Sequence, residues 1–345
     1  MTRFLLLPSL LLGASALAAG CTGADAPEAD LTDEVAVTAD AQAPTLAQAA
    51  ESEAQMRASA REMRLPTLAD IEDPQLEVVT VTPDIDVLTG SGGNVAVLYS
   101  GDEALLIDDK FERNGDEILA RVSARGGARP VYVLNTHFHG DHTGSNARMR
   151  EAGATIIAQD GARDLMTRRI DNKLFGRIME PRPEADLPQI TFGNSMSMGF
   201  GDDMLRLTHV PQGYTGGDMI VEFETADVIH MGDTYFHGMW PVIDVDSGGS
   251  LEGMIAAQGV GLRLADAGTT IVPGHGPVGD RDALQETHDR LVEVRDRMLA
   301  RIEAGDDLDA ILADGIYADY GLNDGFIDDE TITRVVYRSL TEVQP

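Results

Sequence analysis

Basic side chains are scarce in this chain of 345 residues. It holds 26 Lys and Arg against 58 Asp and Glu, so its formal net charge is −32. Lys110 and Lys173 are the only lysines. A surface of this sign repels the phosphate backbone of nucleic acids and anionic lipid headgroups. We therefore expect no nucleic-acid partner and take a small molecule as the substrate class.

Cysteine is almost absent as well, since Cys21 is the only one and no intrachain disulfide can form. Residues 1–20 resemble a secretion signal, with Arg3, an apolar run and then small residues. The segment Leu17-Ala18-Ala19-Gly20-Cys21 resembles the lipobox of bacterial lipoproteins, in which the chain is cut before a Cys that becomes lipidated. We expect residues 1–21 to be a lipoprotein signal peptide and the mature protein to be exported and anchored to a membrane through Cys21. An ordinary signal peptide with an incidental Cys is the alternative.

No later segment is apolar for long enough to span a bilayer. Residues 22–50 lack basic and aromatic side chains and are rich in Ala, Asp, Glu, Pro and Thr. Such a segment buries too little apolar surface to fold. We predict an acidic disordered tether over residues 22–75, with a short helix possible in Leu46–Arg64, and a globular domain over residues 76–345.

The globular part alternates short apolar runs with helical patterns. The predicted strands are Leu76–Leu88, Asn94–Ser100, Ala104–Ile107, Val131–Leu134, Thr155–Ala158, Met204–His209, Met219–Phe223, Val228–Met231 and Thr270–Val272. The predicted helices are Gly115–Arg125, Gly161–Ile170, one capped by Ser250, Asp280–Glu303 and Glu330–Leu340. Strands followed by helix, in two successive rounds, favour two sheets with helices outside.

The strongest chemical signal follows the run Val131–Leu134. The segment Thr136-His137-Phe138-His139-Gly140-Asp141-His142-Thr143-Gly144 holds three imidazoles and one carboxylate. Neutral imidazole and carboxylate are ligands that zinc prefers. His137 and His139 can point one way while Asp141 and His142 point another, so one short loop can serve two adjacent metal positions. A polar loop with chance histidines is the alternative interpretation.

This His-x-His-x-Asp-His pattern resembles the signature of the metallo-β-lactamase superfamily, and the likeness covers about residues 76–340. Residues 93–109 resemble the opening hairpin of the family. Met231-Gly232-Asp233 resembles the Gly-Asp whose carboxylate bridges two metals, and Val272-Pro273-Gly274-His275-Gly276 resembles the element with the last His ligand. Residues 236–250 are similar to an exported bacterial branch of undefined substrate. The resemblance implies an α/β fold, an αββα sandwich of two mixed sheets with helices on the outer faces. The metal ligands it implies are His137, His139, Asp141, His142, Asp233 and His275.

One position departs from the family pattern. Tyr214 stands where the family has a third His of the first metal site, in Gly213-Tyr214-Thr215-Gly216-Gly217-Asp218. A phenol has a pKa of about 10 and ligates zinc only if the metal lowers it. Whether Tyr214 ligates metal stays open, and one zinc is favoured over two. His209, five residues upstream, is expected to be a hydrogen-bonded strand residue rather than a replacement ligand.

Two further features allow a functional and a structural interpretation. Asp108, at the end of a predicted strand, either orients the His loop or caps backbone amides. The basic run Arg163 to Arg182 is either a lid for an anionic substrate or, as we favour, a solvated face paired with nearby acids.

The resemblance implies hydrolysis by a zinc-bound hydroxide of an ester, lactone, β-lactam or similar bond, with Asp141 or Asp233 orienting the water. No Lys shortly follows Asp233, where many β-lactamases hold the substrate carboxylate, and Phe236 is near that place. The C-terminus also lacks the basic cluster that glyoxalase II uses for glutathione. Two alternatives remain: a non-catalytic metal-binding descendant of the fold, and an iron-dependent oxidoreductase of the persulfide dioxygenase type. The oligomeric state is open.

Overall fold

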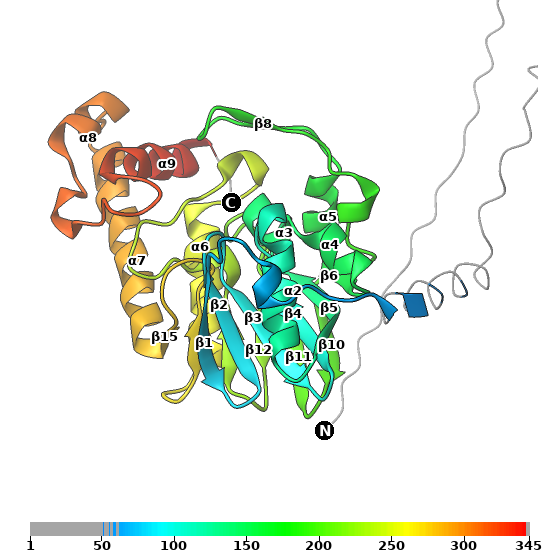
Figure 1. Ribbon diagram of the computed structural model, residues 1–345. Helices are drawn as coiled ribbons and strands as arrows, with labels where there is room; N and C mark the ends of the chain where they lie inside the picture. Colours follow the sequence, from blue (N-terminus) through cyan, green and yellow to red (C-terminus); the bar gives the residue numbers. More distant parts are fainter. Residues whose placement is uncertain (1–50, 52–54, 56–57, 60–61, 343–345) are drawn as a thin grey trace, which may run out of the picture. The chain divides into compact units, whose positions relative to one another are not determined.

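The structure is a computed structural model that describes residues 51, 55, 58–59 and 62–342 (Figure 1). The predicted signal peptide, Cys21 and most of the predicted tether lie outside the described residues. Within the described part, no helix is long and apolar enough to cross a membrane.

The first sheet contains seven strands in the order β1-β2-β3-β4-β5-β6-β9. Its strands are β1 (Leu76–Thr82), β2 (Ile85–Gly90), β3 (Val95–Ser100), β4 (Glu103–Ile107), β5 (Arg129–Asn135), β6 (Thr155–Gln159) and β9 (Ile190–Phe192). The first four pair antiparallel, and the pairs from β4 to β9 are parallel. The single strand predicted for Leu76–Leu88 is wrong, because Pro83 and Asp84 turn the chain and β1 pairs with β2 as a hairpin.

The second sheet contains six strands in the order β10-β11-β12-β13-β14-β15. They are β10 (Ser195–Phe200), β11 (Asp203–His209), β12 (Met219–Phe223), β13 (Val228–His230), β14 (Thr270–Val272) and β15 (Gly279–Asp280). Only β13 and β14 pair in parallel within this sheet. The remaining predicted strands are confirmed to within two residues in both sheets, whereas β9, β10 and β15 were not predicted.

The two sheets pack face to face around the central core. Ile107, Leu134 and Ile157 of the first sheet share one buried cluster with Leu205 and Val221 of the second. The other face of each sheet is covered by helices (Figure 1). The α-helices are α2 (Gly115–Ala124), α3 (Gly140–Thr143), α4 (Asn146–Glu151), α5 (Asp160–Met166), α6 (Leu251–Leu264), α7 (Arg281–Glu303), α8 (Leu308–Asp314) and α9 (Asp329–Glu342). The predicted αββα sandwich is therefore confirmed.

Helices α2 and α4 pack on the first sheet, and α6 and α7 pack on the second. Short 3-10 helices connect the larger elements: η1 (Leu68–Asp70), η2 (Glu112–Asn114), η3 (Glu184–Asp186), η4 (Gly232–Thr234), η5 (Val245–Ser247) and η6 (Ala318–Tyr320). A third cluster joins α6, α7, α8 and α9 to Tyr214, Phe236 and Trp240. The C-terminal helices are thereby packed against residues that lie close to the predicted site.

The packed domain begins before residue 76. Leu65 is buried and belongs to the cluster under α2, and the backbone amides of Gln75 and Leu76 both donate to Glu117. The predicted domain start near residue 76 is therefore too late, because a single apolar residue within a polar segment gives no periodic pattern.

The helix predicted for Gly161–Ile170 is shorter than expected. It ends at Met166, and Ile170 begins a separate hairpin of β7 (Ile170–Asn172) and β8 (Arg177–Met179). Figure 1 shows this hairpin as an arm that runs from α5 toward α9, and Lys173 N donates to Asp246 in η5 at 2.8 Å. In the basic run, Arg168 pairs with Asp164 and Arg169 with Glu180. These ion pairs favour the solvated-face interpretation over a lid.

Candidate metal centre

Six side chains that the sequence singled out meet beside the carboxyl ends of parallel strands. His137 and His139 follow β5, and Asp141 and His142 lie in α3. Asp233 lies in η4 after β13, and His275 follows β14. Because β13 and β14 are parallel neighbours, their ends bring Asp233 and His275 to the same place.

Two glycines allow this close approach. A Cβ on Gly274 would lie 2.0 Å from Oδ1 of Asp233, and a Cβ on Gly93 would lie 2.1 Å from Cε1 of His142. Any side chain at either position would displace a site residue. The glycines therefore serve the geometry of the site rather than a turn alone.

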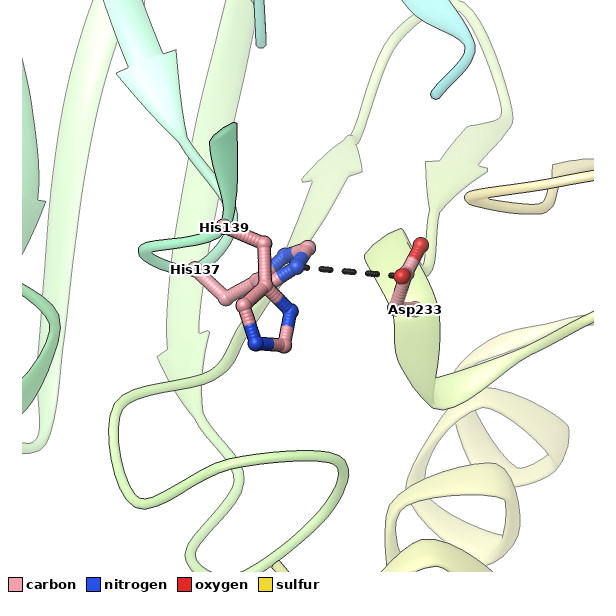
Figure 2. Close-up of side chains that lie close together, drawn as sticks. All are labelled: His137, His139 and Asp233. Atoms are coloured by element: carbon pink, nitrogen blue, oxygen red, sulfur yellow. Dashed lines mark ion pairs between the residues drawn. The ribbon is translucent and has the colours of Figure 1, made fainter. Parts of the chain in front are cut away.

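The six residues form two groups. His137, His139 and Asp233 make the first group, and Asp141, His142 and His275 make the second. Within each group, one candidate ligand atom per residue lies within 4.8 Å of the others. Figure 2 shows the two His side chains of the first group on one loop, with the His137 imidazole directed at Asp233 across the site.

Asp233 faces both groups. Its Oδ2 lies 3.7 Å from Nε2 of His137, the pair marked in Figure 2. Its Oδ1 lies 3.1 Å from Nε2 of His142 and 3.4 Å from Nε2 of His275. This is the placement that a carboxylate shared by two adjacent cations requires.

Buried carboxylates orient two of the imidazoles. Oδ2 of Asp108 accepts from Nδ1 of His142 at 2.7 Å, and Oδ2 of Asp244 accepts from Nε2 of His139 at 2.9 Å. The opposite ring nitrogen of each imidazole is left to face the site. Asp108 also accepts from the amide and hydroxyl of Thr136, so its orienting and capping roles are combined. Sequence reasoning missed Asp244, because no spacing links it to a residue 105 positions away.

The carboxylates dominate the proton balance of the second group. Burial lowers the pKa of His275, but the charge of Asp233 and the hydrogen bonds of Asp141 and Asp233 raise it to about 9. For His142, burial is likewise outweighed by the charges of Asp233, Asp141 and Asp108, and the pKa lies well above its ordinary value. These charges favour the protonated, positively charged form of both imidazoles in the metal-free protein. His137 differs, because burial followed by the charge of His142 holds its pKa well below the ordinary value.

These residues fit a divalent cation. Nε2 of His137 is buried and has no hydrogen-bond partner among the described residues, although it points at Asp233. Nε2 of His142 lies only 3.3 Å from Nε2 of His275, with Asp carboxylates beside both. A buried nitrogen without a hydrogen-bond partner and imidazole nitrogens that converge on one point are both expected where side chains ligate a cation. The donor set of imidazole and carboxylate suits zinc.

Tyr214 lies beside the first group. Its ring centroid is 5.1 Å from that of His137 and 4.9 Å from that of His139, and the side chain is buried. Burial, followed by the charges of Asp233 and Asp141, raises the pKa of the Tyr214 phenol well above its ordinary value. The phenol is therefore neutral in the metal-free protein and is a weak donor to a cation.

His209 is a hydrogen-bonded residue at the end of β11 and belongs to neither group of candidate ligands. Its Nδ1 lies 2.8 Å from the carbonyl oxygen of Asp218. The Asp218 carboxylate holds the loop of Tyr214 by accepting from the amides of Tyr214 and Thr215. The structure thus positions the phenol, and not His209, next to His137 and His139.

Comparisons with known proteins agree with this architecture. The family model described as "Metallo-beta-lactamase superfamily" matches residues 88–297. A hydroxyacylglutathione hydrolase of Anaeromyxobacter dehalogenans is 29% identical over 188 residues, covering 54% of this chain and 62% of the relative. The lactamase-like protein aptB of Emericella nidulans is 26% identical over 224 residues, covering 64% of this chain and 63% of the relative. The chain thus spans less than two thirds of the length of either relative.

Solved structures show the same fold. A metallo-beta-lactamase from Pontibacter korlensis has a TM-score of 0.54 at 18% identity, covering 63% of this chain and 99% of that protein. The DIM-1 metallo-beta-lactamase has a TM-score of 0.52 at 18% identity, covering 64% of this chain and 99% of that protein. The family match extends over more than half of the chain and includes all six candidate ligands. This chain belongs to the metallo-beta-lactamase superfamily.

Proposed function

We propose that the protein is a zinc-dependent hydrolase that cleaves an ester, lactone, β-lactam or similar bond. The observation that carries the proposal is the meeting of two His and Asp groups on the two oxygens of Asp233. A zinc ion in such a site supplies an activated water at neutral pH and polarises the scissile bond.

The exposure of the six residues indicates where a substrate approaches. The Asp141 side chain is 26% exposed, whereas those of the other five residues are at most 7% exposed. Asp141 therefore faces solvent at the edge of the site. We assign to Asp141 and Asp233 the orientation of the attacking water. Each carboxylate can accept a hydrogen bond from that water, while the imidazoles hold the metal.

We further propose that one tightly held zinc suffices. The second group supplies Asp141, His142 and His275, together with a share of Asp233. The first group has two imidazoles and shares the same carboxylate, and the ring beside them is the neutral phenol of Tyr214, a weak donor. Three protein ligands are the usual minimum of a catalytic zinc site, and the second group meets it without sharing Asp233.

Two observations bear on which bond is cleaved. Two of the similar proteins bear the name hydroxyacylglutathione hydrolase, so a thioester belongs among the substrates to be tested. Against an anionic glutathione conjugate, the basic residues of α9 are already paired, Arg334 with Glu330 and Arg338 with Asp246. We therefore favour an ester or lactone.

The test is metal analysis together with a substrate panel. The purified full chain is assayed for bound zinc and iron, and then with esters, lactones, β-lactams, phosphodiesters and a hydroxyacylglutathione. We expect zinc-dependent turnover of an ester or lactone, with loss of turnover in Asp233→Ala and normal turnover in His209→Ala. Bound iron without hydrolysis would favour the oxidoreductase alternative. Full zinc content without turnover of any panel member would favour the non-catalytic one.

We propose also that the protein is an exported lipoprotein held to a membrane through Cys21. The lipobox-like run that ends at the only Cys of the chain supports this. Cell fractionation of wild type and Cys21→Ser is the test. The wild type is expected in the membrane fraction and the variant in the soluble one, and a soluble wild type would contradict the anchor.

A further inference from the structure

Phe326 is a large apolar side chain on the surface beside the site. It is 58% exposed, yet its ring lies edge-on to the imidazole of His275, with centroids 4.8 Å apart and planes at 79°. On the same imidazole, Phe236 stacks at 5.2 Å and 21°, and the two Phe rings are 6.3 Å apart. Two aromatic rings therefore flank the His275 imidazole, one buried and one open to solvent.

The segment around Phe326 is anchored on both sides. The next residue, Ile327, is buried in the cluster of α7 and α9. Asp329 accepts from Nε1 of Trp240 at 2.7 Å and from Nδ2 of Asn323 at 2.8 Å, and its amide donates to Asn323 Oδ1. The exposed ring is thus presented by a fixed backbone. Covering such a ring with an apolar group is favourable, because it removes apolar surface from water.

The charges nearby select against an anionic group at this place. Asp324 and Asp328 flank Phe326 in sequence. A carboxylate placed on the Phe326 ring would meet acidic neighbours. An uncharged aliphatic or aromatic group would meet none of this repulsion. Its contact with the ring would bury apolar surface of both the group and Phe326.

We propose that Phe326, supported from below by the buried ring of Phe236, determines specificity by forming an apolar wall that binds an uncharged aliphatic or aromatic group next to the scissile bond. The proposal rests on the proposed hydrolase function and deepens it, since it names neutral esters or lactones with an apolar acyl group as the substrate class. Phe326 lies beyond the residues 88–297 that the family model matches. The wall is therefore completed by the C-terminal helical segment of this chain.

A binding experiment tests the wall without requiring turnover. Acetohydroxamate and octanohydroxamate carry the same metal-binding group and differ in their apolar tails. Calorimetric titration of the zinc-loaded full chain should give octanohydroxamate a dissociation constant at least about tenfold lower, as burial of two or more methylenes supplies. Phe326→Ala should lose most of this preference, and Phe326→Leu should keep most of it. Zinc content should stay equal in all three proteins.

Two controls make the result decisive. Phe175→Ala removes a Phe that is also exposed, at 44%, and whose ring lies under the guanidinium of Arg177; it should leave the preference unchanged. The emission of Trp240, the only tryptophan, reports whether its contact with Asp329 survives in Phe326→Ala. A preference retained in Phe326→Ala with unchanged emission would overturn the wall. An equal loss in Phe175→Ala would overturn it too, because the tail would then bind exposed apolar surface in general.

The same variants are then assayed with 4-nitrophenyl acetate and 4-nitrophenyl octanoate. We expect Phe326→Ala to raise KM for the octanoate about tenfold more than it raises KM for the acetate. If hydroxamate binding behaves as expected while no ester is turned over, the hydrolase proposal fails and the apolar wall stands. If esters are turned over but neither assay depends on Phe326, the wall fails and the hydrolase proposal stands.

Discussion

Replacement of Tyr214 by His should change the number of zinc ions that the protein holds. In the wild type, the Tyr214 ring lies against both His137 and His139 of the first group. An imidazole at this position would add a third neutral nitrogen donor to the first group. We expect the wild type to retain close to one zinc per chain after dialysis and Tyr214→His to retain close to two, because three imidazoles and a shared carboxylate complete a tetrahedral set.

The same substitution should lower stability without metal and restore it with metal. Tyr214 is buried in the cluster with Phe236 and Trp240, so a smaller ring leaves unfilled space there. A loss of about 1–3 kcal/mol in the free energy of unfolding is expected for the metal-free variant. Zinc at roughly 100 times the Kd of a new site adds about 2.7 kcal/mol. In zinc the variant should therefore approach or exceed the wild type.

Elemental analysis after dialysis gives the zinc content, and urea unfolding with and without zinc gives the stability difference. Tyr214→Phe is the matched control, since it keeps the ring and removes only the hydroxyl. It should hold the same single zinc as the wild type. Two zinc ions in the wild type with one in Tyr214→Phe would refute the reasoning, because they would show that the phenol acts as a ligand.

Three further changes test the ligands and the domain boundary. Asp141→Ala should abolish tight zinc binding because it removes a ligand of the second group, whereas His209→Ala should leave zinc content unchanged; equal losses would place His209 in the site. Asp108→Asn should weaken zinc binding about 10–100-fold, as changes to partners of ligating imidazoles do, because Asp108 orients His142 of the second group; competition with a chelator measures the affinity, and unchanged affinity would exclude an orienting role. Leu65→Ala should lower the free energy of unfolding by about 2 kcal/mol or more, while Leu68→Ala, at an exposed position, should change it by about 0.5 kcal/mol or less; equal effects in urea titration would deny that the domain begins before residue 76.

Local patterns were sufficient to predict most of the fold. The strands that lead to the site, β5 and β14, are short runs of apolar and β-branched residues, and both were located from the sequence. The sequence failed where a polar or mixed segment is ordered by tertiary contacts. The strand β10 was missed although its small and apolar residues alternate with period two, and β7 and β8 are three residues each, which is too short for a readable period.

The candidate ligands could be predicted because they are concentrated in short segments with the pattern of a known family. The partners of those ligands could not. Asp244 lies 105 positions from His139 in the sequence, and Phe326 contacts His275 from the segment that precedes α9. No spacing in the sequence encodes either contact. The residues that orient the site and cover it therefore depend on the tertiary structure, whereas those that hold a cation are visible in the sequence.

The charge balance of the site leads to one last expectation. Asp108, Asp141 and Asp233 lie around His142 and His275. Their negative charges raise the pKa of each imidazole above its ordinary value. A cation can take the place of the imidazole protons, since a ligating nitrogen must be deprotonated. Zinc binding at neutral pH should thus release at least one proton per ion, and the release should fall as pH rises through about 9, where His275 loses its proton unaided. Calorimetric titration in buffers of different ionisation enthalpy measures the release. An observed enthalpy at neutral pH that does not vary with the buffer would mean that these carboxylates do not keep the imidazoles protonated.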